Sequence, residues 1–190
     1  MSSLVETASR AMKVFDSLGV SFCIVGGFGV SVRTEPRFTR DLDFVVATGG
    51  EISAEQLIPH FIRDRWVVAG VVEREATGEI AIIQLQDRDS NQLDLLVGSS
   101  GIEAEVALGA EVLEVLPGLA LPVASVGHLI ALKLLSVDER TRPTDRADLV
   151  SLRSVATDTD LAVAAHAVAL ISERGYERGR DLALALSDLG

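Results

Sequence analysis

With 190 residues, the chain suits one domain with a buried core, or a core with a small helical addition, and two independent domains are excluded. Its formal net charge of −11 at pH 7 excludes a protein that coats nucleic acid by general electrostatic attraction, because binding to phosphates requires a cationic surface. The single cysteine, Cys23, excludes an intrachain disulfide and a thiolate metal site, and we expect it in the core.

The first elements in the chain are a helix, a strand and a second, shorter helix. Apolar residues recur every three or four positions over residues 4–18, which predicts an amphipathic helix ended by Gly19. The apolar run 20–25 predicts a buried strand that Gly26 and Gly27 interrupt. We expect a short helix to begin over residues 28–32.

The next segment predicts further strands and one helix. Ser53 followed by Gln56 forms a capping box, which predicts a helix that runs to about residue 65. Runs rich in β-branched and aliphatic residues predict the strands, and Thr77 and Gly78 mark a turn. The predicted strands cover residues 41–46, 67–73, 79–85 and 92–97.

The last third of the chain is predicted to be helical. Pro117, Gly118 and Pro122 mark a connector, and the helical spacing follows it. The predicted helices cover residues 125–137, 145–155, 159–174 and 180–186. The fold class is therefore α+β: a mixed β-sheet core with flanking helices over residues 1–122, and a helical C-terminal part over residues 123–190.

Three aspartates are the candidate metal ligands. Asp41 and Asp43 are two positions apart on a predicted strand, so both carboxylates project from the same face. Asp94 is a single acid between two leucines on another strand. Carboxylates that share a surface repel one another unless a cation lies between them, and Mg²⁺ or Mn²⁺ is the cation that carboxylates suit. We therefore expect Asp41, Asp43 and Asp94 to form one metal and catalytic site.

Gly26 and Gly27 are the candidate phosphate-binding residues, because their backbone can approach a ligand closely after the buried strand. Taken alone, a Gly-Gly pair is usually a turn and an Asp-x-Asp pair is usually a solvated strand face. Their combination, in this order, favours a functional site. Val32 stands where a dinucleotide-binding fingerprint needs a small residue, and the chain has no Walker lysine motif. The three histidines lack zinc-ligand spacing.

Several short motifs resemble a known family. Gly-Gly at residues 26–27, Asp-Leu-Asp at 41–43 and Leu-Asp-Leu at 93–95 resemble the signature of the DNA-polymerase-β-type nucleotidyltransferases. Leu-Lys-Leu-Leu-Ser at 132–136 and Asp-Arg-Ala-Asp-Leu at 145–149 resemble the third and fourth motifs of the AbiEii-like toxins. Those toxins are nucleotidyltransferases of bacterial toxin–antitoxin pairs.

The resemblance implies a Mg²⁺-dependent transfer of a nucleoside monophosphate from a nucleoside triphosphate to an acceptor hydroxyl. It implies that Asp41 and Asp43 bind metal, that Lys133 contacts the triphosphate, and that Asp145 or Asp148 completes the nucleotide site. It further implies an RNA acceptor, foremost the 3′ end of tRNA, with a protein hydroxyl as the alternative acceptor, and an antitoxin protein as partner.

Two basic features have both a functional and an ordinary interpretation. Arg33, Arg37 and Arg40 either guide a polyanion, with Arg40 next to the nucleotide, or are scattered surface charges. Lys133 either contacts the triphosphate or extends its ammonium to water from an apolar helix. If Lys133 contacts the triphosphate, we expect an alanine at position 133 to change stability by less than about 0.5 kcal/mol, as at other surface positions. A variant that unfolds would instead make Lys133 a packing residue.

Two other functions share this fold. An enzyme that modifies a polycationic aminoglycoside would benefit from an acidic surface, and a nucleotide-binding or partner-binding module would have kept the fold without turnover. The motifs of the C-terminal part favour the toxin-like enzyme, and the three acids argue against loss of turnover. The N-terminal residues lack the pattern of a signal peptide and no apolar run is long enough to cross a membrane, so we expect a cytoplasmic protein.

Overall fold

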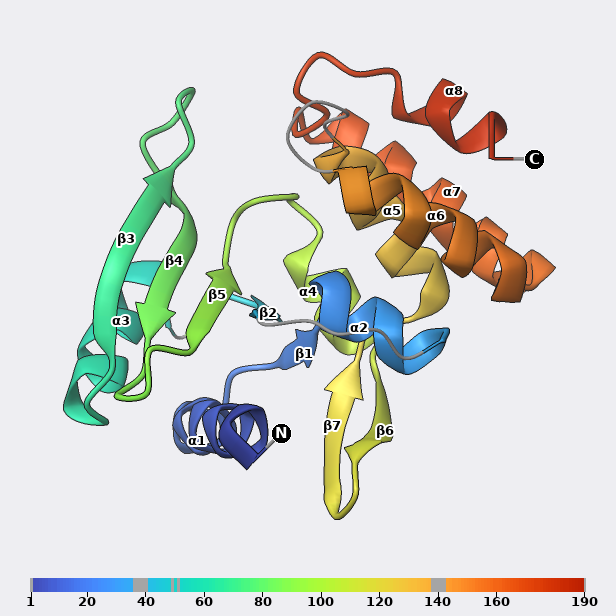
Figure 1. Cartoon of the computed structure of the whole chain (residues 1–190). Helices are drawn as coiled ribbons and strands as arrows, with labels where there is room; N and C mark the ends of the chain where they lie inside the picture. The colour runs from blue at the N-terminus through green and yellow to red at the C-terminus, as the bar shows by residue number, and fades with distance from the viewer. Residues whose placement is uncertain (1, 36–40, 49, 51, 138–142, 190) are drawn as a thin grey trace.

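A mixed seven-stranded sheet forms the centre of the fold (Figure 1). The computed structural model describes residues 2–35, 41–48, 50, 52–137 and 143–189. The strand order is β3-β4-β5-β2-β1-β7-β6, with β2 parallel to β5, β1 parallel to β7, and the other neighbours antiparallel. The strands are β1 (Phe22–Ile24), β2 (Leu42–Val46), β3 (Val67–Glu73), β4 (Ile80–Gln86), β5 (Gln92–Leu96), β6 (Glu111–Leu116) and β7 (Leu119–Val123).

Helices cover both faces of this sheet, and those of the C-terminal part gather beside one another (Figure 1). They are α1 (Ser2–Leu18), α2 (Gly26–Arg33), α3 (Ala54–Arg63), α4 (Glu103–Leu108), α5 (Val126–Ser136), α6 (Pro143–Val155), α7 (Asp158–Glu173) and α8 (Leu182–Ser187). Among the described residues, no helix has both the length and the apolar character needed to cross a membrane.

The first core lies between one face of the sheet and helices α1 and α3. Phe15 of α1 contacts Phe44 of β2 and Phe61 of α3, with ring centroids 5.5 Å apart in both pairs. The predicted capping box holds the start of α3, where the backbone N–H of Ser53 donates to Oε1 of Gln56 at 2.8 Å. Because alternate residues of a strand point to opposite faces, Phe44 occupies this core while Asp43 and Val45 face the other way.

The second core packs the opposite face of the sheet against the C-terminal helices. Val45 and Cys23 meet α4 and α5 here, and α5 is buried along most of its length. Burial raises the pKa of the Cys23 thiol to about 12, so the thiol stays protonated at neutral pH. The sequence prediction that Cys23 is a core residue is confirmed.

Two elements differ from the sequence prediction. Helix α4 was not predicted, and the connector expected at Pro117, Gly118 and Pro122 is part of the antiparallel hairpin β6–β7, with Pro117 and Gly118 at its turn. Pro and Gly suit that turn, where Gly118 has a φ of +78°. Pro122 lies within β7 itself, opposite Val112, and a proline inside a strand is what hid this hairpin from the sequence pattern. The other predicted strands and helices are present, with bounds shifted by a few residues.

Candidate functional site

The structure places Asp43 and Asp94 directly opposite each other on neighbouring parallel strands. They are register partners in the β2–β5 pair, and neighbouring strands lie about 4.8 Å apart. Gln84 of β4 continues the same row on the far side of Asp94. Both aspartates are half-buried, so two acidic groups lie side by side on the face of the sheet that α5 partly covers.

Asp41 lies one residue before β2 and is exposed. Within the described ranges, no group of three or more His, Cys, Asp or Glu side chains is arranged to hold a metal ion. Of the three predicted ligands, the structure pairs Asp43 with Asp94, and Asp41 lies at the edge of this pair. Paired carboxylates are the donor chemistry of a Mg²⁺ or Mn²⁺ site, so the residues fit the expected cation. Arg40 lies outside the described residues.

Helix α2 begins at Gly26, immediately beside Asp43. The N–H of Val25 donates to the carbonyl oxygen of Asp43 at 2.9 Å, which ties the start of the helix to β2. Gly26 has a φ of +59°, and a Cβ built on it would lie 1.8 Å from Oδ2 of Asp43. Gly26 and Gly27 are thus the first residues of α2 and not a loop before it, and the N-terminal N–H groups of the helix lie next to the carboxylate, where a phosphate binds favourably.

Replacing Gly26 by alanine is expected to displace the Asp43 carboxylate and to destabilise the protein by about 1–3 kcal/mol, the usual cost of a strained backbone position plus a clash. Gly19→Ala is the matched control, because Gly19 has a similar φ of +64° but no atom within 4 Å of its added Cβ. Thermal melting of the two variants measures the difference. Equal losses of stability would mean that backbone conformation alone requires glycine at position 26.

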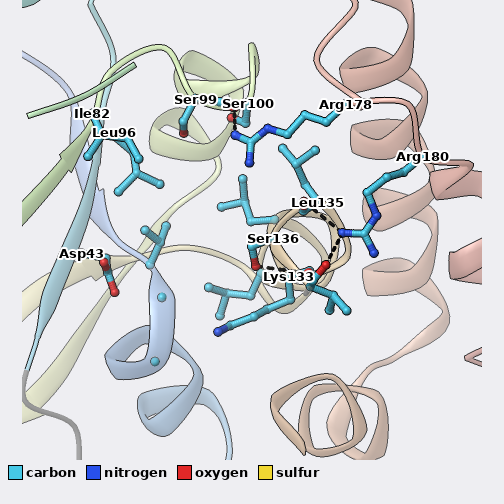
Figure 2. A pocket seen from close by; sticks show the side chains of 16 residues that line it. Asp43, Ile82, Leu96, Ser99, Ser100, Lys133, Leu135, Ser136, Arg178 and Arg180 are labelled. Atoms are coloured by element: carbon cyan, nitrogen blue, oxygen red, sulfur yellow. Dashed lines mark hydrogen bonds between the residues drawn. The ribbon is translucent and has the colours of Figure 1, made fainter. Parts of the chain in front are cut away.

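Gly26, Gly27 and Asp43 form one wall of a pocket of about 780 Å³. Figure 2 shows Asp43 on one side and the α5 side chains Lys133 and Ser136 facing it across the space. The lining residues come from the sheet, the start of α2, the β5–α4 connection, α5, and the connection between α7 and α8. The C-terminal part therefore completes a pocket whose acidic wall belongs to the sheet.

Lys133 is held by two carboxylates. Its Nζ lies 2.6 Å from Oδ1 of Asp145 and 2.8 Å from Oδ2 of Asp148, and Ser136 donates to Oδ2 of Asp145 at 3.2 Å. All three charged side chains are buried, with 11%, 4% and 3% of their surface exposed. The expectation that alanine at position 133 behaves as a surface change is wrong, because its removal would leave two buried carboxylates without their cation.

The same contacts explain the spacing of the C-terminal motifs. Asp145 and Asp148 are three residues apart on α6, so both side chains lie on the helix face that meets α5. The ammonium does not extend to open water, as the second interpretation of Lys133 proposed. It lines the pocket while it joins α5 to α6.

Arg33 has a structural task at the other end of α2. Its Nε donates to the carbonyl oxygen of Ala124 at 2.9 Å, its Nη2 donates to that of Val123 at 3.0 Å, and its Nη1 lies 2.7 Å from Oε2 of Glu111. These bonds hold α2 to β7 and β6. Arg33 is therefore engaged by the protein and is not turned towards a polyanion; its two predicted companions, Arg37 and Arg40, lie outside the described residues.

Four polar residues of the pocket were missed from the sequence. Ser99 and Ser100 follow β5, and Arg178 and Arg180 come from the connection between α7 and α8. The sequence prediction placed Arg180 in the last helix, whereas α8 begins at Leu182. The signal that was available is a basic or aromatic residue at every second position over residues 174–180, with glycine or glutamate between them, which is not a helical spacing.

Comparisons with known proteins give one family match for this chain. The family model described as "Nucleotidyl transferase AbiEii toxin, Type IV TA system" matches residues 10–189. No curated protein matches the chain in sequence.

Solved structures share the fold at low identity. The solution structure of the antibiotic-resistance factor ANT(2'')-Ia is 18% identical, with a TM-score of 0.58, over 98% of this chain and 96% of that one. An antigenic nucleotidyltransferase-like protein from Paracoccidioides brasiliensis is 18% identical, with a TM-score of 0.54, over 96% and 92%. The lincosamide antibiotic adenylyltransferase LnuA is 15% identical, with a TM-score of 0.51, over 80% and 97%. The sheet and its helices are therefore a nucleotidyltransferase fold.

Proposed function

The chain belongs to the nucleotidyl transferase AbiEii toxin family, and from this premise we propose that it moves a nucleoside monophosphate from a nucleoside triphosphate to the hydroxyl at the 3′ end of a tRNA. The observation that carries the proposal is the position of Asp43. It lines a pocket large enough for a nucleotide, lies beside the start of α2, and is paired with Asp94 on the neighbouring strand. We propose a cytoplasmic location and an antitoxin protein as partner, in keeping with the family.

In this reaction the oxygen of the acceptor hydroxyl forms a bond to the α-phosphorus, and the bond from that phosphorus to the oxygen bridging to the β-phosphate breaks. Pyrophosphate leaves. A Mg²⁺ or Mn²⁺ ion held by Asp43 and Asp94, with Asp41 at the edge of the pair, would neutralise the phosphate charge and lower the pKa of the hydroxyl. The carboxylate of Asp94 accepts the hydroxyl proton, because it lies beside Asp43 on the neighbouring strand.

The backbone at the start of α2 and the side chain of Lys133 bind the triphosphate. N–H groups at a helix N-terminus favour an anion, and Gly26 and Gly27 leave no side chain in the way. Lys133 lines the same pocket with its charge held in place by Asp145 and Asp148. Positioning by charges that are fixed before the substrate arrives is the main source of rate in phosphoryl-type transfers.

The proposal is tested by incubating the protein with each α-labelled nucleoside triphosphate, Mg²⁺ and total RNA. We expect label at the 3′ end of tRNA, and we expect a chelator to abolish the labelling. In parallel, Mg²⁺ with a triphosphate analogue at about 100 times its Kd should raise the melting temperature by about 5–10 °C. Label that appears only on protein, or a labelling that resists the chelator, would contradict the proposal.

A further inference from the structure

The connection between α7 and α8 carries a basic or aromatic side chain at every second position, in an alternation that the proposed catalytic machinery does not use. We call residues 174–180 the strap. All four of these side chains contact other parts of the chain. The residues are Arg174, Tyr176, Arg178 and Arg180.

Two of the four anchor the strap outside the pocket. Arg174 donates to the carbonyl oxygen of Gly101 and to Oε1 of Glu105, the latter at 2.6 Å. The hydrogen bond from Arg174 lowers the pKa of Glu105. Tyr176 lies under the guanidinium of Arg74, 3.8 Å from ring centroid to Cζ, and accepts a hydrogen bond from it at 2.9 Å. A Cβ built on Gly101 would lie 2.5 Å from the Tyr176 ring, so the strap packs closely on the β5–α4 connection.

The other two strap side chains line the pocket. Nη2 of Arg178 donates to the carbonyl oxygen of Ser99 at 2.8 Å, and Nη1 of Arg180 donates to the carbonyl oxygens of Val137 at 2.5 Å and Leu135 at 3.3 Å. These bonds hold both guanidinium groups at the wall of the pocket. Within the described part of the chain, Nη2 and Nε of Arg180 donate to no other residue.

The backbone of the strap is strained at position 178. Arg178 has a φ of +56°, in the left-handed region that favours glycine. The two other strap residues with positive φ, at positions 175 and 179, are both glycines. A non-glycine residue that persists in such a conformation within a pocket is a mark of function.

The two arginines lie across the pocket from the acidic wall. Figure 2 shows Arg178 and Arg180 entering from the helical side, with Ser99 and Ser100 beside Arg178 and Asp43 on the opposite side. The proposed site of the triphosphate, at Asp43 and the start of α2, does not require them. They are positive groups at one end of the pocket of a chain with a net charge of −11, so they attract an anion locally.

We propose that Arg178 and Arg180 bind a backbone phosphate of the RNA acceptor and so direct its terminal hydroxyl towards Asp43 and Asp94. Guanidinium groups bind phosphate oxygens through paired N–H donors. They would repel a polycationic acceptor such as an aminoglycoside, so the pair selects RNA over that class. This inference rests on the proposed nucleotidyl transfer.

The test compares the double variant R178Q/R180Q and the single variant R180Q with R174Q, which removes one positive charge from the strap outside the pocket. Binding of a short single-stranded RNA is followed by fluorescence anisotropy over a range of salt concentrations, and binding of a non-hydrolysable triphosphate analogue with Mg²⁺ by calorimetry. For the double variant we expect the Kd for RNA to rise about tenfold or more. Its salt slope should fall by about 0.7 for each lost phosphate contact. The analogue should bind as to the wild type.

R174Q should bind RNA as the wild type does, and R178K/R180K should recover part of the affinity. R180Q alone is measured in parallel, with about half the effect on a logarithmic scale, so that the inference is decided even where the double variant does not fold. It is overturned if only the analogue binds more weakly, which would assign the arginines to the triphosphate, or if R174Q loses as much RNA affinity. It is also overturned if the wild type binds the analogue but no RNA. Nucleotidyl transfer to another acceptor would still be consistent with that result. A wild type that binds no triphosphate would instead contradict the proposed function itself.

Discussion

Asp43→Asn is expected to reduce nucleotidyl transfer by on the order of 10²–10³-fold, the loss typical of removing one fixed electrostatic contact to a transition state. Asp43 is the only residue of the predicted acidic set that lines the pocket, and it lies opposite Asp94 and against Gly26. The amide keeps the shape of the side chain but not its charge. Two carboxylates side by side repel each other when no metal is bound, so we expect the melting temperature without metal to fall little or even to rise.

The comparison variants for this prediction are Asp94→Asn and Asp16→Asn. Asp94→Asn should reduce turnover far more than binding of the triphosphate, because Asp94 is the proposed proton acceptor. Asp16 is exposed on α1, away from the pocket, and its amide variant should behave as the wild type. Transfer rates and the stabilisation by Mg²⁺ are measured for all three. An Asp43→Asn variant that keeps its transfer rate and its response to Mg²⁺ would remove the carboxylate pair from the mechanism.

The alternation of residues along the strands was enough to predict which face each acidic side chain occupies. Phe44 is buried in the core with α1 while Asp43 faces the pocket, as a strand with period two requires. The direct pairing of Asp43 with Asp94 could not be predicted from the same pattern. It depends on β5 lying parallel to β2 in one register, and register is decided by how distant segments pack together.

The C-terminal part shows the same limit. The helical spacing predicted α5 and α6, and the family resemblance singled out Lys133, Asp145 and Asp148. Neither showed that the ammonium and the two carboxylates contact one another in the interior. The contacts of the strap could not be predicted for another reason. Its contacts join residues 174–180 to Ser99 and Gly101, about seventy positions earlier, and no local pattern reports a contact over that distance.

Lys133→Ala is expected to destabilise the protein by about 3–5 kcal/mol, the usual cost of breaking a buried ion pair from one side. For a chain of this length that corresponds to a fall in melting temperature of about 6–20 °C. The reason is the position of the ammonium, 2.6 Å and 2.8 Å from the carboxylates of Asp145 and Asp148. Both carboxylates are almost fully buried, so they would lose their cation without gaining water.

A compensated variant separates this structural cost from the proposed contact with the triphosphate. The triple change Lys133→Met, Asp145→Asn and Asp148→Asn removes all three charges at similar volume, and replacing a buried charged group as a whole is often close to neutral for stability. Its melting temperature should therefore return most of the way to that of the wild type. If Lys133 also binds the triphosphate, the triple variant should remain folded and yet bind a non-hydrolysable analogue at least about tenfold more weakly, since a charge-assisted hydrogen bond to phosphate is lost. A stable triple variant with wild-type affinity would restrict Lys133 to joining α5 and α6, and the binding of the triphosphate would then rest on the start of α2 and the metal alone.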